Sequence, residues 1–140
     1  MKKVLLSLLL LGFNHLYAQE VELSKENKVI VDGKEVLKYE KIDNWQYSFY
    51  NLGGDEILMF KYQNNQTQDD QTDDYFTLNF LTRHKKVETS DFSLIYAANS
   101  KKNMQKLIKL LMKEKVLDMN GVIDTNKLDV FYEKYNQKIK

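Results

Sequence analysis

The chain has 140 residues, of which 21 are Lys or Arg and 20 are Asp or Glu, and it contains two His but neither Cys nor Pro. A formal net charge of +1 argues against a nucleic-acid binder that relies on a strongly basic surface. The lack of Cys excludes disulfides, thiolate metal sites, cysteine nucleophiles and a lipidated N-terminal cysteine. Nothing in the composition indicates a cofactor.

The first 19 residues have the order of a secretory signal peptide. Lys2 and Lys3 form a positive start, residues 4–13 are mostly apolar, and Ala18 and Gln19 mark the expected cleavage site. The apolar block is about half of the roughly 20 residues that span a bilayer, so an uncleaved anchor is the less favoured alternative. We expect residues 1–19 to be removed, leaving residues 20–140 as a single unanchored domain in the periplasm or outside the cell.

Alternation of apolar and polar residues predicts a run of strands after the signal peptide. Asp32 and Gly33 separate two apolar runs and predict a hairpin, because both residues of such a turn need positive φ. Residues 64–74 contain no apolar side chain and predict a loop. The predicted strands are 29–31, 34–42, 45–50, 57–62, 75–82 and a short one within 87–92.

After Asn99 the apolar period changes from two to about 3.6, which predicts helices. Ser100 is the expected N-cap of a helix that runs to about Val116, and Asp124 or Thr125 caps a second helix. The first apolar stripe comprises Met104, Leu107, Ile108, Leu111 and Met112, and the second comprises Leu128, Phe131, Tyr132 and Tyr135. The predicted fold is α+β: an antiparallel β-meander of about five or six strands, followed by two C-terminal helices packed on one sheet face.

Four carboxylates in the loop 64–74 are weak calcium candidates. Asp69, Asp70, Asp73 and Asp74 offer the oxygen ligands that a hard cation prefers. A solvated polar loop is the favoured interpretation, because such a segment cannot bury enough apolar surface to order itself.

A second calcium interpretation concerns residues 118–124, whose sequence is similar to the core of an EF-hand loop. With Gly121 at the sixth position, Val116 and Lys127 take the first and twelfth positions, where acidic ligands are required. The favoured interpretation is therefore a connection between two helices, with Gly121 closing the first and Asp124 capping the second.

Catalytic candidates are few. His84 is the histidine that remains after residues 1–19 are removed, and its position among Arg and Lys residues is typical of a surface turn. Glu40, Asp43, Asp55 and Glu56 lie near predicted strand ends, so two of them could form a carboxylate pair for hydrolysis. Ordinary surface charge is the favoured interpretation of all four carboxylates.

Aromatic residues carry the main functional indication. In Phe49-Tyr50 and Tyr75-Phe76, neighbouring rings must point to opposite sheet faces. If Trp45, Tyr47, Phe49, Phe76 and Phe80 face the helices, Tyr50 and Tyr75 lie on the open face, and Tyr39 or Tyr62 could join them. Exposed tyrosines suit contacts with protein or stacking on carbohydrate, because the ring is rigid and carries a polar tip.

The sequence therefore favours an exported, non-enzymatic binding or interaction module. The alternatives are a small carboxylate-dependent hydrolase and a structural accessory protein of the cell envelope. The signal peptide, the Val31–Lys34 hairpin turn, the aromatic meander and the helical end together resemble small exported proteins of the Bacteroidetes group. That resemblance implies export and carries no particular activity.

Overall fold

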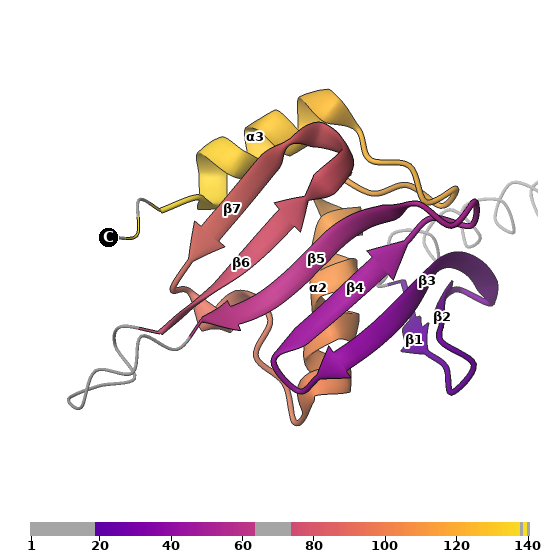
Figure 1. The fold of residues 1–140 in the computed structure, drawn as a ribbon. Helices are drawn as coiled ribbons and strands as arrows, with labels where there is room; N and C mark the ends of the chain where they lie inside the picture. Colours follow the sequence, from indigo (N-terminus) through magenta and orange to yellow (C-terminus); the bar gives the residue numbers. More distant parts are fainter. Residues whose placement is uncertain (1–18, 64–73, 138, 140) are drawn as a thin grey trace, which may run out of the picture.

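The computed structural model describes residues 19–63, 74–137 and 139 and has the predicted α+β fold (Figure 1). Its antiparallel sheet has seven strands in sequence order. The short 3-10 helix η2 (Leu81–Arg83) lies between the last two strands, and η3 (Phe92–Leu94) follows the last strand. Two helices follow, α2 (Ser100–Lys113) and α3 (Thr125–Tyr135). The strands are β1 (Val21–Leu23), β2 (Lys28–Val31), β3 (Lys34–Asp43), β4 (Gln46–Tyr50), β5 (Glu56–Gln63), β6 (Tyr75–Phe80) and β7 (Lys85–Thr89).

The strand count exceeds the expectation because β1 has only three residues, too few for an alternation to be recognised. The predicted hairpin between β2 and β3 is confirmed, since Asp32 and Gly33 have φ values of 50° and 83°. The expected signal peptide lies outside the described residues except for Gln19. Within the described part of the chain, no helix is both long and apolar enough to cross a membrane.

The N-terminus of α2 differs from the prediction by one residue. Asn99, not Ser100, is the N-cap, and its Oδ1 accepts a hydrogen bond from the backbone N–H of Lys102 at 2.9 Å. This frees the Ser100 hydroxyl to reach the sheet, where it lies 3.1 Å from the hydroxyl of Tyr47. For α3 the predicted cap is confirmed, because Asp124 Oδ1 accepts from the N–H of Lys127 at 2.9 Å.

Both helices cover the same face of the sheet, with α2 crossing behind the strands in Figure 1 and α3 beside β7. Tyr47, Phe49 and Phe80 on this face are buried, as are the predicted stripe residues Leu107 of α2 and Phe131 of α3. Phe131 meets Phe80 edge to face at a centroid distance of 6.4 Å. The face that α2 and α3 cover is called the helix face below, and the other is called the open face.

Gly121 closes the connection between the two helices. Its φ is +74°, and a Cβ at this position would lie 2.5 Å from the backbone oxygen of Val36. Asp118 Oδ1 accepts hydrogen bonds from the N–H groups of Asn120 and Val122, at 2.8 and 3.0 Å. The carboxylate of Asp118 thus orders the turn itself. The expectation that Gly121 closes the first helix is wrong, because α2 ends at Lys113 and its C-cap is Glu114.

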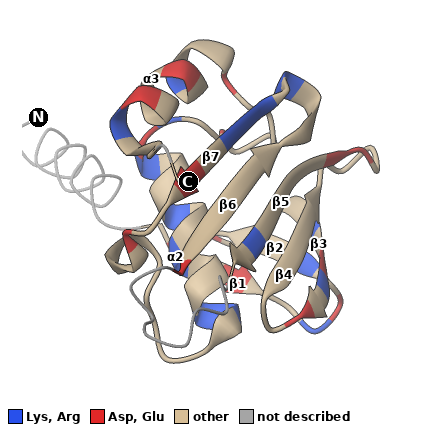
Figure 2. Cartoon of the chain, turned by 60° about the vertical axis from the view of Figure 1, so that its left-hand side comes forward, with Lys and Arg blue, Asp and Glu red and all other residues tan. Residues whose placement is uncertain are grey.

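Charged side chains of α3 form ion pairs with neighbouring elements. Lys85 of β7 contacts Asp129 at 2.5 Å, and Figure 2 shows basic residues in blue on β7 and acidic residues in red on α3. Glu114, just after α2, accepts hydrogen bonds from Lys134 at 2.8 Å and from the Tyr135 hydroxyl at 2.9 Å. The ammonium of Lys134 lowers the pKa of the Glu114 carboxyl, against the effect of burial.

The outer edge of β7 is covered by residues that follow α3. The N–H of Glu88 donates to Asn136 Oδ1 at 2.9 Å, and the carbonyl of Glu88 accepts from the N–H of Gln137 at 2.7 Å. The side chain of Gln137 also accepts from the N–H of Ser90 at 3.0 Å. These residues satisfy backbone groups that an edge strand otherwise leaves open.

Candidate functional site

The four tyrosines expected to form a binding surface are divided between the two faces of the sheet. Tyr39 pairs with Phe49 and Tyr62 pairs with Phe76, and directly opposite residues share a face. Tyr39 and Tyr62 therefore lie on the helix face, whereas Tyr50 and Tyr75, each next to a buried Phe, lie on the open face. The possibility that Tyr39 or Tyr62 joins the open face is thus wrong, and the tyrosines form no common patch.

Tyr39 has a place in the core. Only 7% of it is exposed, its ring stacks on Tyr47 at 6.2 Å, and its hydroxyl donates to the carbonyl of Ser24 at 2.6 Å. Burial raises the pKa of this hydroxyl, in keeping with a neutral group that fixes the segment before β2.

On the open face, Tyr50 and Tyr75 are half-buried among polar side chains. The hydroxyl of Tyr50 donates to Glu40 Oε2 at 3.1 Å, which raises its pKa, and Tyr75 pairs with Gln63. The open face therefore offers two separate rings and not an aromatic-rich surface.

The carboxylates considered as a catalytic pair lie in separate places, on the open face and in turns. Glu40 binds Tyr50 on the open face, and Asp43 Oδ1 accepts from the N–H of Trp45 at 2.7 Å within a turn. Asp55 and Glu56 lie in and after the next turn, where Asn51 Oδ1 accepts from the N–H of Asp55 at 2.9 Å. His84 is exposed and has a φ of 51° between η2 and β7.

Of the calcium candidates, Asp69, Asp70 and Asp73 lie outside the described residues. Asp74 is buried, and its Oδ2 accepts a short hydrogen bond from the hydroxyl of Tyr62. Among the residues that the structure describes, no three or more His, Cys, Asp or Glu side chains gather as a metal site would require.

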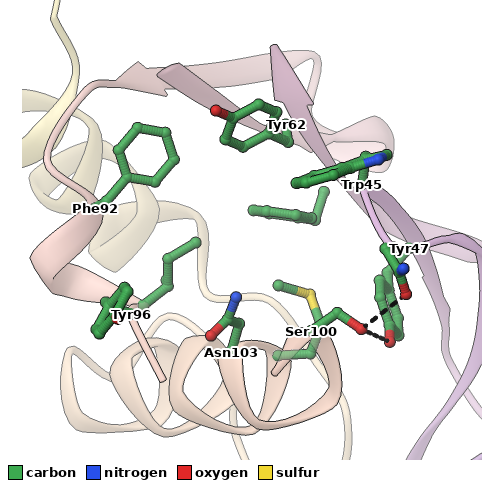
Figure 3. A pocket seen from close by; sticks show the side chains of 11 residues that line it. Trp45, Tyr47, Tyr62, Phe92, Tyr96, Ser100 and Asn103 are labelled. Atoms are coloured by element: carbon green, nitrogen blue, oxygen red, sulfur yellow. Dashed lines mark hydrogen bonds between the residues drawn. The ribbon is translucent and has the colours of Figure 1, made fainter. Parts of the chain in front are cut away.

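A different site lies on the helix face, between the sheet and the start of α2. Here the side chains enclose a cavity of about 170 Å³, called the aromatic pocket below and drawn in Figure 3. Strands β4 and β5, the turn before β4, the segment around η3 and the first turn of α2 all contribute. The lining residues are Asn44, Trp45, Tyr47, Phe60, Tyr62, Phe92, Ile95, Tyr96, Ser100, Asn103 and Met104.

A chain of tilted rings forms one wall of the aromatic pocket. Trp45 lies 4.9 Å from Tyr62, and Tyr62 lies 5.5 Å from Phe92, as measured between ring centroids. The backbone N–H of Tyr62 donates to the carbonyl of Trp45 at 2.7 Å, which fixes the turn onto β5. Phe92 is supported from behind by Phe76, again at 5.5 Å. The sheet and η3 thus bring these rings together in one wall.

The segment that follows η3 lies across the aromatic pocket from Trp45 (Figure 3). Lys106 of α2 donates to the carbonyls of Ser93 and Tyr96, at 3.1 and 3.2 Å, and so fastens this segment to the helix. Tyr96 is 75% exposed and Trp45 is 58% exposed, so both stand at the pocket's opening to solvent.

Three of the polar side chains that line the aromatic pocket bond to one another. The Tyr47 hydroxyl contacts the Ser100 hydroxyl at 3.1 Å, and Ser100 donates to Asn44 Oδ1 at 3.4 Å (Figure 3). Asn103 points from α2 toward the aromatic side chains (Figure 3). Within the described part of the chain, its Oδ1 is the one buried side-chain oxygen or nitrogen without a hydrogen-bond partner. Such a group is costly to leave unpaired, by about 1–3 kcal/mol.

Tyr62 remains neutral over the ordinary pH range. Burial, and then the hydrogen bond to the Asp74 carboxylate, raise the pKa of its hydroxyl to about 12. An unfolded chain would lose this proton at a lower pH, near the ordinary pKa of 10.0.

Tyr62 should therefore make folding sensitive to alkali. Because the folded pKa is raised, its contribution is fully present below pH 10 and is lost as the pH rises toward 12. We expect the wild type to lose stability relative to Tyr62→Phe between pH 10 and pH 12, as measured by urea unfolding. A stability difference that stays constant over this range would contradict the assignment.

Sequence reasoning placed Trp45 on the helix face but missed Asn103 as a site residue. Asn103 lies four residues before Leu107, so it continues the apolar stripe of α2 with a polar side chain. A polar residue in the register of a buried stripe is the signal that could have identified it.

Comparison with protein-family models, curated proteins and solved structures found no match to the chain. The chemistry of the aromatic pocket is therefore argued from its own geometry.

Proposed function

We propose that the protein is an exported, non-enzymatic binding module that holds a small uncharged organic molecule in the aromatic pocket. The observation that carries this proposal is a cavity of about 170 Å³ that is lined mainly by aromatic side chains and toward which the amide of Asn103 points (Figure 3). A mostly apolar cavity with a few convergent polar groups is typical of small-molecule sites. Export is proposed from the order of residues 1–19.

The chemistry of the lining favours binding over hydrolysis. The lining side chains, all of them described, are aromatic, aliphatic, hydroxyl, amide and thioether groups, and none is an acid, an imidazole or an amine. Tyr62 is unsuited to proton transfer near neutral pH, because its pKa is raised to about 12. The candidate carboxylates Glu40, Asp43, Asp55 and Glu56 do not line the aromatic pocket.

The proposal can be tested with the chain's own fluorophore. Trp45 is the only tryptophan and stands at the opening, so a bound molecule should change its emission. We would titrate the purified protein with a set of uncharged one-ring compounds and expect dissociation constants of about 0.1–1 mM, as ligands of this size allow.

Two variants give the test its controls. Asn103→Phe should fill the cavity and abolish the fluorescence response, whereas Tyr75→Ala, on the open face, should leave it unchanged. If no compound responds, or if Asn103→Phe responds like the wild type, the aromatic pocket is not the binding site. Loss of binding by Tyr75→Ala would instead indicate that the binding site lies on the open face.

A further inference from the structure

The amide of Asn103 and the rings around it define a class of ligand for the aromatic pocket. Resting on the proposed function, we infer that the pocket takes an uncharged aromatic ring that carries a carbonyl group, as in an aryl ketone, and that the carbonyl oxygen accepts a hydrogen bond from Asn103 Nδ2. The orientation of the amide, the other hydrogen bonds of the lining, and the size, walls and charge of the cavity each lead to this class.

Asn103 presents the nitrogen of its amide to the cavity. In Figure 3 this nitrogen lies on the side that faces the cavity, and none of the other side chains drawn accepts a hydrogen bond from it. The amide oxygen, in contrast, is enclosed by protein and has no partner among the described residues. Turning the amide over would bury two unpaired N–H donors in place of one acceptor, so the observed orientation leaves fewer polar groups unsatisfied. The cavity therefore receives a donor.

Two hydroxyls of the lining have already used their protons. Ser100 donates to Asn44 Oδ1 at 3.4 Å, so the contact of 3.1 Å between the hydroxyls of Ser100 and Tyr47 is donated by Tyr47. Asn44 also has an amide nitrogen, but this residue is exposed and its N–H groups can bond to water. Neither hydroxyl therefore has a proton left for a molecule inside the cavity.

The remaining donors of the lining are either bonded or exposed. The hydroxyl of Tyr62 donates to Asp74, whereas Trp45 and Tyr96 are exposed, so water can satisfy their polar groups. Among the lining side chains that are not exposed, Asn103 Nδ2 is therefore the donor left for a bound molecule. A carbonyl oxygen would pair with it, whereas a hydrocarbon of the same shape would leave it unpaired.

The volume of the aromatic pocket sets the size of the ligand. A closed apolar cavity of about 150 Å³ accepts benzene. The aromatic pocket, at about 170 Å³, therefore has room for one six-membered ring with a small substituent such as an acetyl group. Because Trp45 and Tyr96 stand exposed at the opening, such a ring can enter from solvent.

The walls favour an aromatic ring over an aliphatic one. Trp45 and Tyr62 are tilted by 44°, and Tyr62 and Phe92 by 39°, so together they form a curved surface. A ring placed against this surface can make edge and face contacts with more than one side chain. The thioether of Met104 in the lining adds a sulfur, which also contacts aromatic rings favourably.

The charge of the lining favours a neutral acceptor over an anionic one. Since none of the lining side chains is charged, a carboxylate on the ring would lose its water without gaining an opposite charge. A ketone brings an acceptor oxygen to Asn103 Nδ2 without that cost. The class is therefore an uncharged aryl ketone or a closely related aryl carbonyl compound.

Four small probes test this assignment: acetophenone, its hydrocarbon isostere α-methylstyrene, the aliphatic cyclohexyl methyl ketone, and benzoate. Each is titrated by calorimetry into the purified wild type, Asn103→Leu and the open-face control Tyr75→Ala. Leucine suits this position, because it favours helices and removes the buried oxygen that has no described partner.

The comparison that isolates the hydrogen bond is the ratio of the affinities for acetophenone and α-methylstyrene. This ratio should fall about tenfold from the wild type to Asn103→Leu, because the free ligands are the same in both titrations and only the bond to Nδ2 is lost. Tyr75→Ala should keep the ratio of the wild type. In the wild type, cyclohexyl methyl ketone should bind about threefold, and benzoate about tenfold, more weakly than acetophenone.

The side-chain amide signals of Asn103 give a second readout by nuclear magnetic resonance. In isotope-labelled protein these signals are identified by their absence from Asn103→Leu. Acetophenone should move an Asn103 amide proton downfield, as donation to an oxygen does, whereas α-methylstyrene carries a similar ring and should lack this downfield contribution.

An affinity ratio that is the same in the wild type and in Asn103→Leu, or the lack of a downfield shift with acetophenone, would overturn the inferred hydrogen bond. Binding of cyclohexyl methyl ketone or benzoate as tight as that of acetophenone would overturn the aromatic or the uncharged part of the class. If all four probes fail while other one-ring compounds bind, the class is wrong and the aromatic pocket stays a binding site. If those compounds fail as well, the proposed function itself is overturned.

Discussion

Gly121→Ala is expected to lower the free energy of unfolding by about 2–4 kcal/mol. Two costs combine at this position. Alanine must adopt a φ of +74°, and its Cβ would lie 2.5 Å from the backbone oxygen of Val36 and 3.1 Å from the side chain of Leu37. Relief requires the connection between α2 and α3 to move away from β3. Urea denaturation followed by circular dichroism measures the loss.

Gly54→Ala provides the matched control. Gly54 has a φ of +93°, yet nothing lies within 4 Å of a Cβ built there. The Gly54→Ala variant therefore measures only the cost of placing alanine at a positive φ, which we expect to be about 1 kcal/mol. Equal losses in the two variants would show that close packing against Val36 is unimportant.

Phe131→Ala should destabilise the protein by about 3–5 kcal/mol, the range for removing a large buried ring. Phe131 is 1% exposed and lies between Phe80, at 6.4 Å, and Tyr135, at 4.8 Å. Leu128 is the other fully enclosed residue of this short helix, so α3 docks through few side chains. We expect partial release of α3 before global unfolding, seen as faster amide exchange over 125–135.

Val130→Ala is the control on the same helix, because Val130 is 56% exposed and should change stability by less than about 0.5 kcal/mol. A small effect of Phe131→Ala would mean that the ion pairs Lys85–Asp129 and Lys134–Glu114 hold α3 instead. That outcome is not expected, since exposed pairs contribute about 1 kcal/mol or less.

The fold was predictable where local chemistry decides structure. The Asp32-Gly33 turn and the cap at Asp124 depend on a few neighbouring residues, and both are confirmed. The strand β1 and the cap at Asn99 were not identified. A three-residue strand has no readable period, and both Asn99 and Ser100 are good capping residues.

The faces of the tyrosines were harder to predict because the sheet contains register shifts. Val29 and Ile30 face Leu37 and Glu35, so Val36 is an extra residue in β3. Both Val36 and Leu37 are buried, so buried and exposed side chains do not alternate regularly along β3 before Tyr39. Similar shifts occur within the β3–β4 and β4–β5 pairs. A single such shift moves every following side chain to the other face.

The aromatic pocket could not be assembled from the sequence at all. Its residues come from segments 44–47, 60–62 and 92–104, whose proximity depends on the crossing of α2 behind β4 and β5. Only the polar residue in the stripe of α2, Asn103, carried a readable signal of the site. Its significance depends on knowing that no described neighbour satisfies its oxygen.

The covering of β7 by Asn136 and Gln137 has a consequence for self-association. A sheet that can extend at both edges may add copies without limit, as a growing fibre does. Here one edge is occupied by the chain's own side chains and backbone, and β1 forms the other edge of the described sheet. Within the described sheet, strand addition between copies would then be favoured at β1 over β7, and two β1 edges facing each other would make a closed pair. Asn136 and Gln137 thus oppose the addition of a second copy at the Glu88 position of β7.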